Sequence, residues 1–127
     1  MTIQTHLDAL RQKTAGCQLT AFGDLSSKLI LRSSSAAHCP REVLDSLCAK
    51  AVTCFSILDS DTAAELTKNG HYGQTAIMFT PGQSFVFGRP DLAADDVTCA
   101  VIDSAQDVEQ ALHTIRDTVS KIGENGR

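Results

Sequence analysis

Few residues in this sequence could do chemistry, and the best candidate is the adjacent pair His38 and Cys39. A nucleophilic thiol needs a base beside it, and the N-terminus of a helix lowers the pKa of a cysteine. Because the pair directly precedes Pro40, where we expect a helix to begin, Cys39 is the one plausible activated nucleophile. We prefer the alternative interpretation, in which Cys39 is a half-buried residue that caps the helix.

The remaining titratable residues form no recognisable catalytic or metal-binding pattern. His6, His71 and His113 are not spaced as pairs of metal ligands. Asp95 and Asp96 are consecutive, so on a strand they would point to opposite faces of the sheet. The glycine motifs that bind phosphate groups are absent. We therefore expect no catalytic residue, no metal and no cofactor, and we expect a protein that is not an enzyme.

The composition narrows the class of protein. The 127 residues suit a single domain, residues 1–127, with a core at about residues 5–122. The net charge is −4 and no basic cluster is present, which argues against nucleic-acid binding. We expect no signal peptide, and no apolar run reaches about 20 residues, so we expect a cytoplasmic protein without membrane insertion. The five cysteines include no CxxC pair, and we expect them to be free thiols.

Hydrophobic periodicity and turn signals predict eight elements. They are a helix at 5–14, strands at 17–23 and 28–32, a helix at 40–58, strands at 74–80, 83–88 and 97–102, and a helix at 104–122. Strands that are joined mostly by hairpins favour an antiparallel sheet. The expected fold class is α/β (α+β), a five-stranded sheet with the central helix on one face and the terminal helices on the other. His71 and Tyr72 make the long loop 59–73 a candidate binding tip.

Several local signals set the expected ends of these elements. Pro40 suits the first position of the central helix, with Cys39 as its cap. Thr5 with Asp8 resembles a capping box for the first helix, and Ser104 with Asp107 does so for the last. Gly123 is a natural stop for the last helix. Pro81-Gly82 predicts a type II turn between two strands, because glycine accepts a positive φ.

The central helix is more apolar than a helix with one buried face needs to be. Apolar residues at helical spacing fill one broad face, and three more, Val43, Val52 and Ile57, widen it. Two interpretations remain open from the residues alone. The helix is either tucked deep into its own domain or also forms part of a subunit interface.

The order and spacing of the elements, over about residues 7–122, resemble the roadblock / dynein light chain family. The family opens with an L-x-x-L helix that ends in glycine, which here is Leu7 and Leu10 running to Gly16. Its first hairpin ends in small residues before a long apolar helix, as residues 29–34 do here. The chain departs from the family pattern at Lys28, where a closing glycine is expected, and at Arg32, where a small residue is common.

The resemblance implies a non-enzymatic adaptor or regulatory protein that forms homodimers or heterodimers. In the family, the central helices and an edge strand form the dimer interface, and the dimer binds small Ras-like GTPases or subunits of larger complexes. Carried onto this chain, the expected interface residues are Val43, Leu44, Leu47, Ala51, Cys54, Phe55, Leu58, Ile77 and Phe79. The alternative is a profilin-like or PAS-like module that senses a small ligand, which requires a pocket between sheet and helix.

Overall fold

The computed structural model describes residues 2–59, 74–103 and 108–125. Its elements follow the predicted order α-β-β-α-β-β-β-α. They are α1 (Ile3–Lys13), β1 (Cys17–Asp24), β2 (Leu29–Ser35), α2 (Arg41–Leu58), β3 (Thr75–Thr80), β4 (Gln83–Gly88), β5 (Asp96–Asp103) and α4 (Val108–Asn125).

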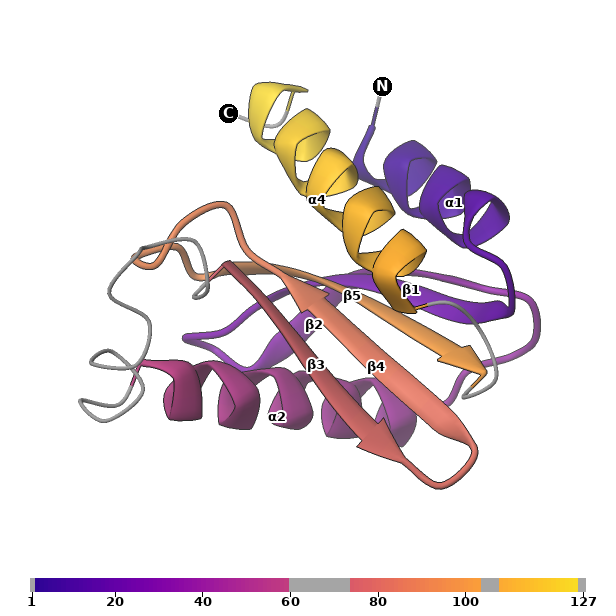
Figure 1. Ribbon diagram of the computed structural model, residues 1–127, viewed down its shortest axis with the longest axis horizontal. Helices are drawn as coiled ribbons and strands as arrows, with labels where there is room; N and C mark the ends of the chain where they lie inside the picture. The colour runs from indigo at the N-terminus through magenta and orange to yellow at the C-terminus, as the bar shows by residue number, and fades with distance from the viewer. Residues whose placement is uncertain (1, 60–73, 104–107, 126–127) are drawn as a thin grey trace.

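The five strands form one antiparallel sheet in the order β2-β1-β5-β4-β3. Helix α2 covers one face of this sheet, and α1 and α4 lie side by side on the other face (Figure 1). The arrangement confirms the predicted fold class. It also makes β2 and β3 the two edge strands, whereas β1 and β5, far apart in sequence, pair at the centre.

Alternation along the strands builds two apolar cores, one on each face of the sheet. In β5, Val97, Cys99 and Val101 belong to the core under α2, whereas Ala100 and Ile102 belong to the core under α1 and α4. Residues 97–102 are all buried, because helices cover both faces at the centre of the sheet. The buried part of this central strand is therefore apolar at every position except Thr98.

Three helix ends differ from the prediction. Helix α1 begins at Ile3, and the Thr2 hydroxyl accepts the cap hydrogen bond from the Thr5 amide, so the expected Thr5 capping box is wrong. Pro40 is the N-cap of α2 and makes no side-chain cap bond, which leaves Cys39 outside the helix. Helix α4 continues through Gly123 to Asn125, because a glycine lowers helix stability without ending a helix by itself. The proposed cap at 104–107 lies outside the described residues.

The first hairpin is longer than predicted. Strand β2 continues to Ser35, since residues 33–35 pair with residues 19–21 of β1, and three serines gave no strand signal in the sequence. In the turn, Lys28 adopts a φ of 61°, in the left-handed region that favours glycine. In the second hairpin Gly82 has a φ of 85°, as the predicted type II turn requires.

Candidate interaction surface

The inward side of α2 belongs to the core of the chain itself. Leu44, Leu47, Ala51 and Phe55 are each at most 8% exposed and pack with the inward residues of the sheet. Helix α2 contacts β1, β2, β3 and β5, so the sheet is wide enough to cover this whole side. As folded, these four predicted interface residues present almost no surface to a partner, and their place in an interface stays a prediction.

The side of α2 that turns away from β2 is different. Helical spacing places Val43, Lys50, Cys54 and Ile57 along one side. Val43 is 47% exposed and Ile57 is 63% exposed, whereas Cys54 and Leu58 are partly buried against the core. Ile57 was not among the predicted interface residues, although its spacing from Cys54 and Val43 is the signal that could have found it.

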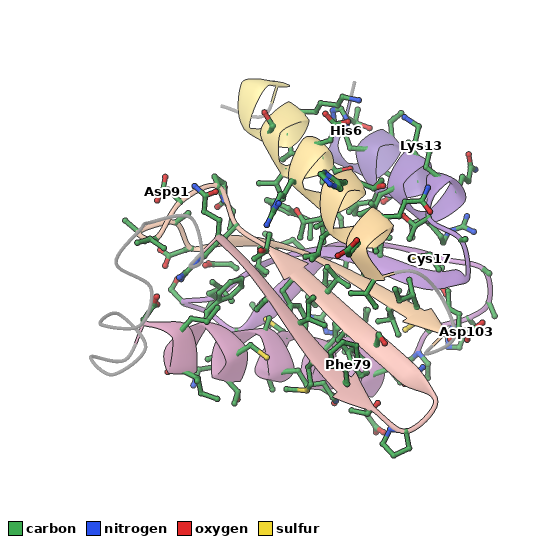
Figure 2. The ribbon with its side chains drawn as sticks, in the orientation of Figure 1. His6, Lys13, Cys17, Phe79, Asp91 and Asp103 are labelled. Atoms are coloured by element: carbon green, nitrogen blue, oxygen red, sulfur yellow. The ribbon has the colours of Figure 1, made fainter. Side chains whose placement is uncertain are left out.

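The other half of the surface is β3, an edge strand as the resemblance implied. Ile77 and Phe79 pair with Val86 and Ser84, and Val86 lies in the core under α4. Cross-strand partners share a face of the sheet, so Ile77 and Phe79 point away from α2. Phe79 is 69% exposed on the β3–β4 hairpin (Figure 2).

Ala76 and Met78 are β3 residues that point toward α2, and Met78 packs against the same core as Cys54 and Leu58. The predicted interface residues therefore divide between the two faces of the sheet. We define the α2–β3 surface by two groups of residues. On the face of the sheet that α2 covers, they are Val43, Cys54, Ile57, Leu58 and Met78. On the opposite face, they are Ile77 and Phe79. Both groups lie along the same edge of the molecule.

The two edges of the sheet are not equivalent. On β2, the Gln4 side chain donates to the Ser33 carbonyl at 3.0 Å, and Arg41 donates to the Ile30 carbonyl at 3.0 Å. Among the described residues, no side chain donates to a backbone carbonyl of β3. Since an open edge is a template for another strand, β3 is better prepared than β2 to pair with a second chain.

A buried arginine joins the C-terminus of α2 to the loop after β4. The Arg89 guanidinium donates to both carboxylate oxygens of Asp59, at 2.6 and 3.1 Å, and lies 4.2 Å from the centre of the Phe55 ring. The Arg89 amide donates to the Gln74 carbonyl at 2.8 Å, directly before β3 begins. Arg89 thus positions α2 and β3 relative to each other. Nothing in the local sequence pattern had pointed to it.

The candidate nucleophile lacks the environment that activates a thiol. His38 is exposed, and Cys39 is a half-buried residue outside the helix. Burial raises the pKa of the Cys39 thiol, which disfavours the reactive thiolate at neutral pH. The structure therefore gives no support to the hypothesis of a His38–Cys39 active site.

The other candidate groups are scattered. His6 is a buried residue of α1, His113 is exposed on α4, and Asp95 lies in the loop before β5. His71 and Tyr72 lie outside the described residues. Within the described parts of the chain, no three metal-binding side chains are grouped, all five cysteines are free, and no helix could span a membrane.

The antiparallel five-stranded sheet, with its one long helix on one face and two helices on the other, defines a roadblock-like α/β fold. No family model matches the sequence, and no curated protein matches it. Solved structures with a similar fold do match the chain.

Three of these structures cover nearly the whole chain. The Roadblock/LC7 domain from Streptomyces avermitilis has a TM-score of 0.75 at 9% identity, covering 95% of this chain and 94% of that one. MglC from Myxococcus xanthus has a TM-score of 0.67 at 11% identity, covering 96% and 97%. An MglB with a tetrameric arrangement has a TM-score of 0.73 at 14% identity, covering 98% and 90%. The likeness confirms the roadblock-like fold.

Proposed function

We propose that this protein is a dimeric adaptor or regulatory protein that pairs with a second copy through the α2–β3 surface. The observation that carries the proposal is the open β3 edge beside exposed apolar residues of α2, above all Ile57. An MglB of the same fold has a tetrameric arrangement, which supports self-association as one use of this fold.

A two-fold axis at β3 gives the dimer a definite form. Two copies of β3 pair antiparallel, so the two sheets continue into each other and the backbone groups of both edges are satisfied. The two α2 helices then approach on one face, where Val43 and Ile57 lose their exposed surface. On the other face, Phe79 of each copy covers the neighbouring strand.

The dimer in turn binds another protein, and no chemistry is performed by the chain itself. The family that the sequence resembles directs us to a small Ras-like GTPase or a subunit of a larger complex as the partner, in the cytoplasm. The joined sheets offer such a partner a surface that neither copy has alone. Binding of this partner requires the dimer.

Light scattering after size exclusion tests the dimer, with matched variants at both edges. At micromolar concentration the wild-type protein runs as a dimer. Ile57→Glu and Phe79→Glu weaken the dimer about tenfold or more, because each places an unpaired carboxylate in the apolar interface. Leu31→Glu on the β2 edge and Leu92→Glu in the loop after β4 are the controls, since both residues are more than half exposed.

Two results would contradict the proposal. A wild-type protein that remains a monomer at these concentrations excludes the dimer. A dimer that survives Ile57→Glu but is broken by Leu31→Glu places the interface on the β2 edge instead. All four substituted side chains are exposed, so loss of folding does not complicate the comparison.

The alternative function, a module that senses a small ligand, is favoured by one specific observation. A cavity of about 540 Å³ lies between α2 and the sheet, which is within the usual size range of ligand sites. The chemistry of its lining decides what ligand it would accept.

A further inference from the structure

The cavity lies under the N-terminal half of α2, and we call it the α2 cavity. Strands β1, β4 and β5 form its floor, with Leu19, Phe85 and Val101, and Leu47 of α2 faces them. The small residues of the loop before α2, Ala36 and Ala37 among them, form one wall. The body of the site is therefore apolar, and it is open to solvent on one side.

Lys50 supplies a cation at this apolar site. Its ammonium lies 5.3 Å from the centre of the Phe85 ring and donates to the Ser46 hydroxyl at 2.6 Å. An ammonium has three donors, so this bond leaves others to bind a ligand. Among the described residues, no carboxylate lies within 4.0 Å of the Lys50 nitrogen. An anionic group on a ligand would supply that counter-charge.

Glu42 is the other charged side chain that lines the cavity, and it lies well away from Lys50. Glu42 precedes Lys50 by eight residues on α2, which is about 12 Å along the helix axis. A ligand anion is therefore attracted to the Lys50 end and repelled at the Glu42 end. Gln18 and Gln83, whose side chains lie 3.5 Å apart, add neutral amide groups to the lining.

We propose that the α2 cavity binds a small amphipathic carboxylate, with its apolar body between Leu47 and Phe85 and its carboxylate at Lys50. Burial of the apolar body supplies most of the affinity. The charge-assisted hydrogen bond to Lys50 fixes the orientation and selects an anion over a neutral molecule of the same shape. Every residue of the site belongs to one chain, and one lining residue, Val43, also belongs to the α2–β3 surface.

Calorimetric titration with octanoate, 1-octanol and octylamine tests the charge requirement. Octanoate binds the wild-type protein about tenfold more tightly than 1-octanol, because one charge-assisted hydrogen bond is worth about 1.5 kcal/mol or more. Octylamine binds more weakly than both. Lys50→Met keeps most of the apolar stem and removes the charge, so the affinity for octanoate falls about tenfold to that of 1-octanol.

Two further variants separate the site from the rest of the surface. Lys13→Met removes an exposed lysine at the end of α1, away from the cavity lining, and leaves all three affinities unchanged. Ala37→Trp introduces an indole at an exposed residue of the cavity wall, and it weakens octanoate and 1-octanol alike by filling the apolar space. In amide NMR spectra of the wild-type protein, octanoate shifts residues of the loop before α2 and of the first half of α2.

The proposal is overturned if octanoate fails to bind at millimolar concentration, or if it binds no better than 1-octanol. It is equally overturned if Lys50→Met and Lys13→Met bind octanoate alike, or if the shifted amides lie elsewhere. Ile57 does not line the cavity, so Ile57→Glu retains octanoate binding whatever it does to the dimer. The two proposals can therefore fail separately.

Discussion

Arg89 donates two hydrogen bonds to the carboxylate of Asp59 from a position where its own side chain is only 3% exposed. Asp59 is 47% exposed, so the pair joins a buried cation to an anion that water still reaches. The Phe55 ring lies against the guanidinium and completes its surroundings. The Arg89–Asp59 ion pair thus connects the C-terminus of α2 with the start of the loop after β4.

We expect Arg89→Ala to lower the free energy of unfolding by about 3 kcal/mol. The substitution removes the bidentate pair and the contact with Phe55, and it leaves a cavity beside a packed ring. Urea denaturation monitored by circular dichroism measures the loss. Arg32→Ala, at an exposed position of β2, is the matched control and should change stability by no more than about 0.5 kcal/mol. Equal effects of the two substitutions would contradict a structural role for Arg89.

A glycine at Lys28 should stabilise the protein. Among the described residues, Lys28 is the one non-glycine with a positive φ, in the turn where the resembled family has its closing glycine. Lys28→Gly relieves an unfavourable backbone conformation worth about 1 kcal/mol, although the extra freedom of glycine in the unfolded chain offsets part of the gain. The midpoint of urea denaturation should rise. Ser27→Gly, in the same turn, should lower it, because the Ser27 hydroxyl donates to Asp24.

The stability should fall on mild acidification because of His6. The side chain is 4% exposed, and burial lowers its pKa from 6.5, with the positive charge of Lys121 acting in the same direction. A histidine with a lowered pKa contributes stability that is fully present above pH 6.5, and the contribution is lost as the pH falls from 6.5 toward the folded-state pKa. Thermal denaturation at a series of pH values, from about 7.5 down through 6.5 and below, measures the loss.

His6→Gln should make that pH profile flatter, because glutamine does not titrate. His113→Gln, at an exposed position of α4, is the control in which the loss on acidification persists. A profile that is identical in the His6 variant and the wild type would assign the acid sensitivity to other groups.

The rate at which each thiol reacts with an aromatic disulfide reagent should follow the exposure of that thiol. A neighbouring histidine should not raise the rate. Burial raises the pKa of Cys39 and of Cys54, so neither is held as a thiolate at neutral pH. Cys99 is completely buried and should react only on unfolding. Comparison of Cys39→Ser and Cys54→Ser measures the two rates. A Cys39 that reacts many times faster than Cys54 would restore the hypothesis of an activated nucleophile.

Local pattern was enough to predict the order of the eight elements in the part of the chain that the structure describes. Alternation marked β1, the Pro81-Gly82 turn marked the second hairpin, and helical spacing marked α2 and α4. Boundaries were less accurate where the local signal is weak. The serines at the end of β2 are held in the sheet by pairing with β1, and Gly123 remains helical within α4.

The candidate site was harder to predict because it depends on which side of each element meets the sheet. Apolar spacing alone cannot separate the core residues of α2, such as Leu47, from exposed residues such as Ile57. Strand register decided that Ile77 and Phe79 point away from α2. The pairing of Arg89 with Asp59 joins residues thirty positions apart, and a single sequence contains no local signal for it.

The pairing of β1 with β5 at the centre of the sheet has a consequence for the synthesis of the protein. Cys17 pairs with Ile102, so the pairing of the two strands joins residues that lie far apart in the sequence. Closing a loop of this length is slow, and β1 has no second neighbouring strand until β5 has been synthesised. During synthesis, one edge of β1 therefore stays unpaired until residue 103 has emerged from the ribosome.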